Sequence, residues 1–193
     1  MEIEDYKKFL KKELSDRRYH HSLNVAEMAR HLAHVWGYNE DIAYIAGLFH
    51  DCAKEMSKET QKELILSSEY ELDYAELVTD KLWHGIAGAQ FIKTNFGIEN
   101  REILDSIRFH TVGRKNMTLL DEIIYVADYI SADRKMPVVP EVRALADKDL
   151  KLAVLSELRN SIVTTAYKGG FIPKCTLDAY NHYLKYSEEL NNK

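Results

Sequence analysis

The sequence predicts an all-α fold, and three observations support this prediction. The 193 residues include only three prolines and eight glycines, so little of the chain is marked as turns between short strands. Apolar residues recur at helical spacing over most of the chain. Two runs that are rich in apolar residues, 42–49 and 119–130, have the composition of helices buried on nearly all sides.

Length, composition and charge limit the class of protein. A chain of 193 residues with 46% hydrophobic and 30% charged residues suits one globular domain, 1–193. We expect a core at about 15–135 and C-terminal helices at about 141–190. The net charge of −5 gives no general attraction to nucleic acid or membranes. Cys52 and Cys175 form no paired-cysteine motif, and the charged N-terminus lacks a signal peptide, so we expect a cytoplasmic protein.

Five helical segments are expected in the first half of the chain. They cover about residues 2–13, 15–36, 41–51, 58–79 (as one or two helices) and 81–96. Serines and glycines mark their ends, because serine hydroxyls cap helix N-termini and glycine tolerates the left-handed conformation that ends many helices. The expected N-caps are Ser15 and Ser57, and the expected ends are Gly37 and Gly97.

The segment 15–36 places one histidine among apolar side chains. At about 100° per residue, His21 lies in line with the expected core stripe of Val25, Met28, Leu32 and Val35. The other histidines of this segment fall on the opposite face, where we expect solvent; they are His20, His31 and His34.

The second half of the chain is expected to form five more helical segments. The first starts near residue 101, and the next three cover 119–130, about 141–146 and 150–167. The last runs toward residue 190, with Thr176 as its expected N-cap. The loop 111–116 carries two cationic side chains, and Gly169 and Gly170 end the helix before the last. About nine or ten helices result, without an internal repeat or a linker.

Six histidine and aspartate residues fall on positions that helical periodicity assigns to the interior. In order they are His21, His50, Asp51, His84, His110 and Asp128. An unpaired buried carboxylate destabilises the folded protein by about 3–5 kcal/mol. The two aspartates therefore require a cation, hydrogen bonds or a proton. Imidazole and carboxylate groups are ligands for zinc, manganese or iron. The six residues therefore predict one divalent ion, or two ions bridged by Asp51.

The order His, His-Asp, His, His, Asp on helices resembles the HD-domain metal-dependent phosphohydrolases. The local segments are similar to the bacterial symmetrical bis(5'-nucleosyl)-tetraphosphatase group over nearly the whole chain; they are RRYHHSLNVAEMA, AGLFHDCAKE, WHGIAGA, RFHTVGRKNMTLLDEIIYVADYISADR and IPKCTLDAYN. The resemblance implies an HD-domain helical bundle with the metal site at its centre. It also implies cleavage of diadenosine tetraphosphate to two ADP, with iron or with manganese, cobalt or zinc.

The resemblance also implies roles for single residues. His21, His50, Asp51 and Asp128 match the ligands of a first ion, and His84 and His110 match groups that complete a second site or hold phosphate. The catalytic set is then Asp51, Lys54, His84 and Arg134. The substrate-binding set adds His21 and His110 to Arg18, Lys54, Lys81, His84, Gly85, Thr111 and Arg134. Ile172 and Tyr180 stand where the group is expected to have His and Arg, which changes the C-terminal part of the nucleotide pocket.

The mechanism implied is attack by a metal-activated hydroxide on one inner phosphorus, while Lys54 and Arg134 hold the other phosphates. The plain alternative for Arg18, Lys54, Lys81 and Arg134 is ordinary surface charge. Other hypotheses stay open for the whole chain. One is an HD phosphohydrolase acting on nucleoside monophosphates, cyclic dinucleotides or guanosine tetraphosphate. Another is a metal-stabilised nucleotide-binding module without turnover, and a third is a helical interaction protein with polar core residues. A homodimer is also open.

Overall fold

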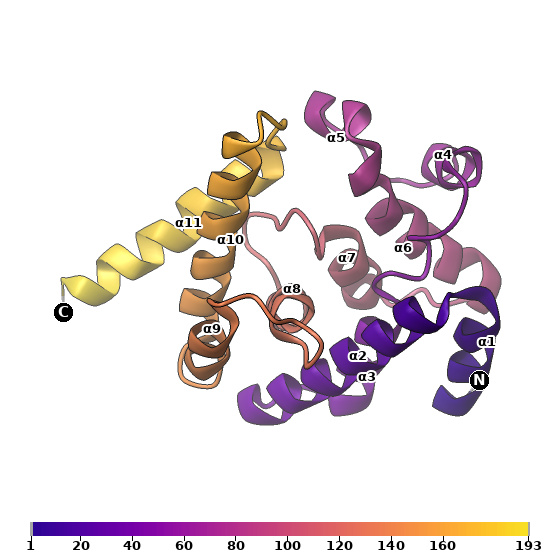
Figure 1. Ribbon diagram of the computed structural model, residues 1–193, viewed down its shortest axis with the longest axis horizontal. Helices are drawn as coiled ribbons and strands as arrows, with labels where there is room; N and C mark the ends of the chain where they lie inside the picture. The colour runs from indigo at the N-terminus through magenta and orange to yellow at the C-terminus, as the bar shows by residue number, and fades with distance from the viewer. Residues whose placement is uncertain (1, 193) are drawn as a thin grey trace.

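The α8 helix (Leu119–Ile130) lies at the centre of the protein, and other helices surround it in the computed structural model, which describes residues 2–192 (Figure 1). Its side chains Ile123, Ile124 and Val126 are fully buried. It packs against helices from both halves of the chain, namely α2 (Asp16–Trp36), α3 (Glu40–Phe49), α7 (Arg101–Phe109), α9 (Val139–Ala146) and α10 (Leu150–Tyr167). Its apolar composition follows from this position, because few of its faces meet water.

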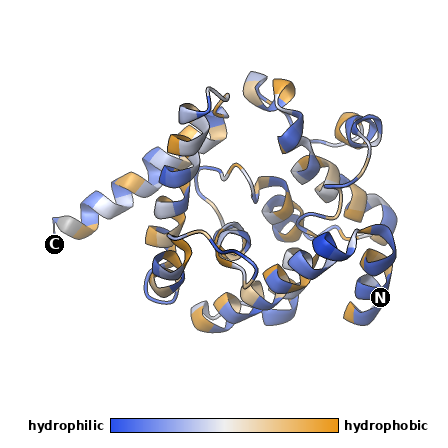
Figure 2. Cartoon of the chain, in the orientation of Figure 1, coloured by the Kyte–Doolittle hydropathy of each residue, from blue (hydrophilic) through white to orange (hydrophobic). Residues whose placement is uncertain are grey.

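The remaining helices pack around this central group. They are α1 (Ile3–Glu13), α4 (Lys58–Leu66), α5 (Tyr74–Val78), α6 (Trp83–Phe96) and α11 (Lys174–Asn191), with a 3-10 turn at Asp80–Leu82. Hydrophobic and hydrophilic residues alternate along these helices (Figure 2). Helix α1 and the C-terminal end of α11 lie on opposite sides of the protein (Figure 1). Residues 2–192 contain no strand, so the all-α prediction is confirmed.

The predicted helix ends at serine and glycine are confirmed. The Ser15 hydroxyl accepts a hydrogen bond from the Arg18 backbone N–H at 3.3 Å, and Gly37 has φ of 71°. Ser57 accepts from the Thr60 N–H at 3.1 Å, and Gly97 has φ of 63°. These signals are local, since each depends only on residues within one turn, and a sequence therefore carries them completely.

Two local predictions are wrong. Val35 was expected on the buried stripe of α2, but it lies in the last turn of this helix and is 39% exposed. Thr176 was expected to cap the last helix, which instead begins at Lys174 after Pro173. The Thr176 hydroxyl is buried and donates to the Val112 carbonyl at 2.7 Å, so it joins α11 to the loop after α7.

Two glycines allow helices to approach closely near the centre of the protein. A Cβ atom at Gly47 in α3 would lie 2.9 Å from the Ala26 Cα of α2, and one at Gly85 in α6 would lie 2.8 Å from the Arg108 carbonyl oxygen of α7. Both distances are shorter than packed atoms allow. Among residues 2–192, no helix has the length and hydropathy that crossing a bilayer requires.

Candidate metal centre

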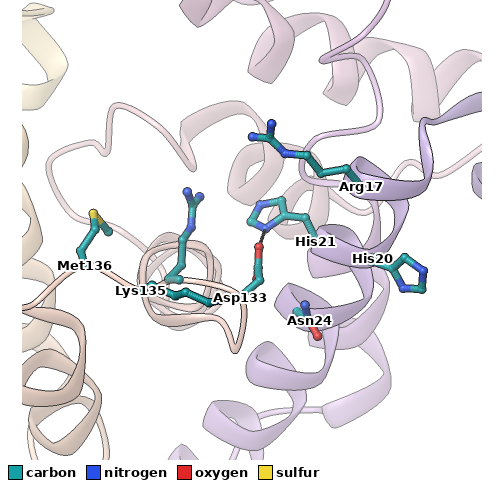
Figure 3. Close-up of a pocket in the computed structure, with 8 residues that line it drawn as sticks. Arg17, His20, His21, Asn24, Asp133, Lys135 and Met136 are labelled. Carbon is teal, nitrogen blue, oxygen red and sulfur yellow. Dashed lines mark hydrogen bonds and ion pairs between the residues drawn. The ribbon is translucent and has the colours of Figure 1, made fainter.

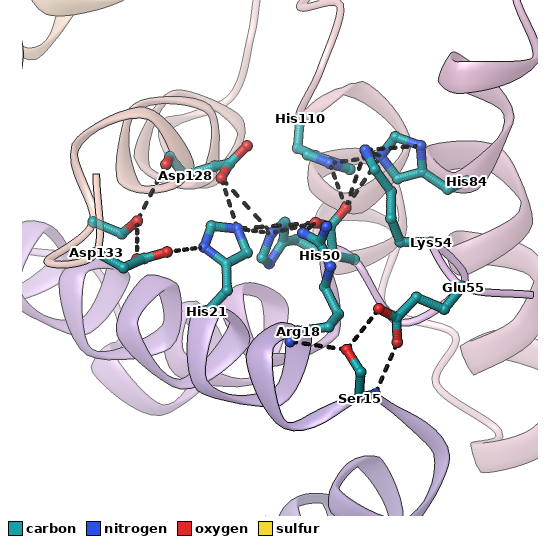
Figure 4. A network of polar contacts seen from close by, with 12 residues as sticks. Ser15, Arg18, His21, His50, Lys54, Glu55, His84, His110, Asp128 and Asp133 are labelled. Atoms are coloured by element: carbon teal, nitrogen blue, oxygen red, sulfur yellow. Dashed lines mark hydrogen bonds and ion pairs between the residues drawn. The ribbon is translucent and has the colours of Figure 1, made fainter. Parts of the chain in front are cut away.

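Five helices bring the six predicted ligands to one place. His21 lies in the second turn of α2, the pair His50 and Asp51 directly follows α3, and His84 lies in the first turn of α6. His110 directly follows α7, and Asp128 lies in the last turn of α8. All except the partly exposed Asp128 are buried. Their side chains form a row with His21 and Asp128 at one end and His84 and His110 at the other (Figure 4).

The six side chains form two clusters that share Asp51. At one end, the His21 Nε2 atom lies 3.0 Å from Asp128 Oδ1 and 3.3 Å from His50 Nε2. At the other end, the Nε2 atoms of His84 and His110 lie 3.2 Å apart. Asp51 Oδ2 lies 3.5 Å from His50 Nε2, and Asp51 Oδ1 lies 3.1 Å from His84 Nε2. The two oxygens of one carboxylate therefore face different clusters.

The hydrogen bonds of the four imidazoles all leave Nε2 directed into the centre. The Nδ1–H groups of three histidines donate to the backbone carbonyl three residues earlier: His50 to Gly47 at 2.7 Å, His84 to Lys81 at 2.8 Å and His110 to Ile107 at 2.7 Å. His21 Nδ1–H donates to Asp133 Oδ2 at 2.8 Å. Such outer hydrogen bonds fix the tautomer of metal-binding histidines and leave the Nε2 lone pair available to a cation.

The charges of the centre favour a divalent cation. Asp51 Oδ1 is buried without a hydrogen-bond partner among the described residues. Burial raises the pKa of Asp51, but the electrostatic attraction of the nearby His50 lowers it more strongly. The pKa of Asp51 therefore lies well below its ordinary range. Burial also opposes ionisation of Asp128, but hydrogen bonding to His21 lowers its pKa below the usual value. Two ionised carboxylates beside four imidazoles are a ligand set that fits a divalent metal.

The histidines differ in their protonation. Burial lowers the pKa of His84 to about 4 and also lowers the pKa of His110, so both are neutral ligands near neutral pH. Burial lowers the pKa of His50 as well, but the adjacent Asp51 carboxylate outweighs this effect and raises it. A metal ion at His50 Nε2 would therefore displace a proton, as is usual for metal binding by histidine.

Three predicted phosphate-binding cations surround the centre. Arg18 Nη1 contacts Asp51 Oδ2, and Arg134 Nη2 contacts Asp128 Oδ1. Lys54 Nζ lies 2.9 Å from His84 Nε2 and 3.7 Å from Asp51 Oδ1. The three positively charged side chains come from three different segments, and all of them lie beside Asp51 or Asp128. This convergence argues against the alternative of ordinary surface charge for these three residues.

The other predicted substrate residues lie beside the centre. Lys81 and Thr111 line a cavity of about 410 Å³, which we call the His84-side cavity because the Lys81 carbonyl accepts from His84 and Thr111 directly follows His110. Ile172 lines the same cavity, with Phe171 and Lys168. Gly85 is buried against the α7 backbone, so the structure gives it a packing function, and substrate binding by Gly85 stays a prediction. Tyr180 packs against the hydrophobic core from α11.

Two carboxylates support the elements that carry the predicted ligands; Asp133 had no predicted function, and Glu55 was expected to be a solvated or supporting group. Asp133 orients His21 and also accepts from the Ser131 hydroxyl at 2.8 Å. Glu55 accepts from the Ser15 backbone N–H at 2.8 Å and from the Ser15 hydroxyl at 2.7 Å, which ties the start of α2 to the segment after Asp51. Asp133 lies 112 positions from His21, so no local spacing could relate them.

Comparison with known proteins identifies the family to which this sequence belongs. The HD domain family profile matches residues 18–133, which is more than half of the chain and includes all six predicted ligands. The chain belongs to the HD domain family. The predicted helical bundle with the histidine and aspartate cluster at its centre is thus confirmed as an HD-domain fold, and its site fits a divalent metal.

Full-length relatives of this HD-domain chain are known. It is 40% identical over 178 residues to the symmetrical bis(5'-nucleosyl)-tetraphosphatase of Halalkalibacterium halodurans, covering 91% of this chain and 93% of that protein. It is 38% identical over 175 residues to the enzyme of the same name from Bacillus subtilis, covering 89% and 92%. A crystal structure of an HD superfamily hydrolase described as involved in NAD metabolism, from Clostridium acetobutylicum, superposes with a TM-score of 0.92 at 38% identity, covering 96% and 98%.

Proposed function

We propose that this protein hydrolyses dinucleoside tetraphosphates symmetrically and converts diadenosine tetraphosphate and water into two ADP. The observation that carries this proposal is the convergence of four Nε2 atoms and two ionised carboxylates beside three cationic side chains. The names of relatives that match most of the chain support the same reaction. Iron is the proposed metal, with manganese, cobalt and zinc as alternatives.

The ligand geometry supports two ion positions. His21, His50 and Asp128 would hold one ion with Asp51 Oδ2, and His84 and His110 would hold another with Asp51 Oδ1. Divalent ions in such a site make a bound water acidic and stabilise charge on phosphoryl oxygens. Asp51 would contribute to both ion positions, because its Oδ2 lies 3.5 Å from His50 Nε2 and its Oδ1 lies 3.1 Å from His84 Nε2. Asp133 keeps the His21 ring in the orientation that presents Nε2.

The cationic side chains would position the substrate. Arg18, Lys54 and Arg134 lie around the carboxylates, where their N–H groups can donate to phosphate oxygens. Water adds its oxygen to one inner phosphorus, the bond from this phosphorus to the central bridging oxygen breaks, and that oxygen leaves with the second ADP. Positive charge beside the bridging oxygen stabilises the charge that develops as it leaves.

The His84-side cavity would hold the nucleoside of one half. Its lining combines apolar side chains, Phe171 and Ile172, with the amino groups of Lys81 and Lys168. An apolar pocket with a few polar groups is typical of sites for small ligands. Ile172 makes this wall apolar where the group resembled by the sequence is expected to have histidine.

Product analysis tests the proposed reaction. Purified protein loaded with iron or manganese is incubated with diadenosine tetraphosphate, and nucleotides are separated by chromatography. Two ADP for each substrate molecule are expected. ATP with AMP, or no conversion, would contradict the proposal, and a panel of nucleoside monophosphates, cyclic dinucleotides and guanosine tetraphosphate tests other HD phosphohydrolase reactions.

The arrangement of the core supports one domain for residues 1–193. The hydrophobic core cluster includes Tyr6 from α1 and Tyr183 from α11. A homodimer and a cytoplasmic location stay predictions, which sedimentation and cell fractionation would test.

A further inference from the structure

A second cavity opens at the other end of the metal centre. It has a volume of about 620 Å³ and is lined by Arg17 and Asn24 of α2 and by Lys135 and Met136 of the loop after α8. We call it the His21-side cavity, because His21 and Asp133 form its inner wall (Figure 3). None of its four outer residues belongs to the predicted metal or substrate site.

The two cavities lie at opposite ends of the row of ligands. The His84-side cavity contains Lys81, whose carbonyl accepts from His84, and Thr111, which follows His110. The His21-side cavity contains His21 and Arg134, the residues that contact Asp128. In Figure 4, His21 and His84 lie on the two sides of His50. A chain of phosphates that crosses the metal centre would therefore have a cavity at each end.

The His21-side cavity has the charge that a polyphosphate requires. Arg17, Arg134 and Lys135 line it, and Asp133 is its one carboxylate. That carboxylate already accepts from His21 and Ser131. Within residues 2–192, neither Arg17 nor Lys135 forms an ion pair, so both positive charges are uncompensated. In a protein with a net charge of −5, this local excess of positive charge favours an anionic ligand.

We infer that the His21-side cavity binds the second nucleoside diphosphate half of the substrate, an inference that rests on the proposed function. Symmetrical cleavage leaves one nucleoside diphosphate on each side of the broken bond, and the His84-side cavity accommodates only one of them. Arg17 and Lys135 bind the phosphates of the second half. The Met136 thioether offers an adaptable apolar surface to the base, and the Asn24 amide offers a hydrogen-bonding group.

This arrangement makes recognition of a symmetrical substrate asymmetric. One half binds a mainly apolar wall that includes Ile172, and the other binds a cationic wall that includes Arg17 and Lys135. The centre then prefers substrates that fill both cavities over single nucleotides, because only these gain both sets of contacts. Arg17 and Lys135 are specificity residues in this scheme and lie outside the metal cluster.

The double variant Arg17→Ala/Lys135→Ala tests the inference in the metal-loaded protein. Both side chains are exposed, so the fold and the metal content should stay as in the wild type. The KM for diadenosine tetraphosphate should rise about tenfold, because charge-assisted phosphate contacts are lost. Titration calorimetry should give two bound ADP per chain for the wild type and one for the variant. Arg159→Ala/Lys115→Ala is the matched control, since both residues are exposed and lie outside both cavities.

The outcomes separate the two proposals. If the wild type releases two ADP but the double variant keeps the KM and binds two ADP, the second site is refuted while the proposed function stands. If the control pair raises the KM equally, general charge explains the effect and the inference is wrong. If the loaded wild type yields no ADP from this substrate, the proposed function fails and the inference fails with it.

Discussion

The close packing of α6 on α7 predicts that Gly85→Ala destabilises the protein and loosens the metal centre. The new Cβ atom would lie 2.8 Å from the Arg108 carbonyl oxygen and 3.3 Å from the Ile107 carbonyl oxygen. Both obstructing atoms belong to the backbone, so the two helices must separate. His84 precedes the substituted residue and His110 follows Arg108 closely, so their Nε2 atoms, now 3.2 Å apart, would separate as well.

Gly88→Ala is the matched control, because it lies one turn further along the same helix. Its Cβ atom would lie 3.4 Å from the side chains of Cys52 and Ile107, which is ordinary contact. Both substitutions gain about 1 kcal/mol of helix propensity, so this gain cancels in the comparison. Overpacking costs about 1–3 kcal/mol. At about 2–4 °C per kcal/mol for a chain of this size, Gly85→Ala should melt roughly 2–12 °C below Gly88→Ala.

Thermal unfolding of both variants, with metal content measured on the same samples, provides the assay. Gly85→Ala should melt lower and hold less metal at the His84 end, because metal ligands tolerate displacements of only about 0.2 Å. Equal melting temperatures and equal metal contents for the two variants would refute the reasoning that close helix packing positions His84 against His110.

Three further predictions concern single side chains. Arg134→Ala should keep the bound metal but lower kcat/KM for diadenosine tetraphosphate by roughly 10-fold or more, since a charged hydrogen bond contributes about 1.5–3 kcal/mol; loss of metal in this variant would assign Arg134 to the metal site instead. Thr176→Val should cost about 1–3 kcal/mol in urea unfolding, because the buried Val112 carbonyl loses its donor, and unchanged stability would show that water replaces it. Glu157 is buried, and its Oε2 atom has no hydrogen-bond partner among residues 2–192; burial, with the charge of Asp128, raises the pKa of Glu157 well above the ordinary value. In the pH window above the ordinary pKa, the folded state therefore binds more protons than the unfolded state, so this group makes stability fall as pH rises. Glu157→Gln should remove that fall between pH 5 and pH 8, and identical slopes for both proteins would contradict it.

Helix positions were predictable from the sequence because they depend on local patterns, and the same patterns indicated the interior histidine and aspartate residues that the structure brings together. Ser15 and Gly37 mark the two ends of α2 through interactions within one turn. His21 and Asp128 fall on apolar stripes, which predicts an interior position for each; His21 is buried, whereas Asp128 is partly exposed. The ordered series of histidines and aspartates, which resembles the HD-domain enzymes, then related these positions to one another.

Contacts between distant segments were not predictable in the same way. Asp133 orients His21 across 112 positions, and Thr176 binds the Val112 carbonyl across 64. The buried pair of Arg108 and Glu76, 2.6 Å apart, joins α7 to α5 across 32 positions. Each partner has an ordinary sequence environment, and only the packing of the helices brings the two together.

Bound metal in the wild type and in Asp51→Asn tests the central claim most directly, because Asp51 faces both ligand clusters. Elemental analysis after loading with iron or manganese and removal of free metal gives the content per chain. At least one equivalent is expected in the wild type and almost none in Asp51→Asn. A wild type that retains no metal, or an Asp51→Asn protein that retains as much as the wild type, would contradict the assignment of these six side chains to a metal centre.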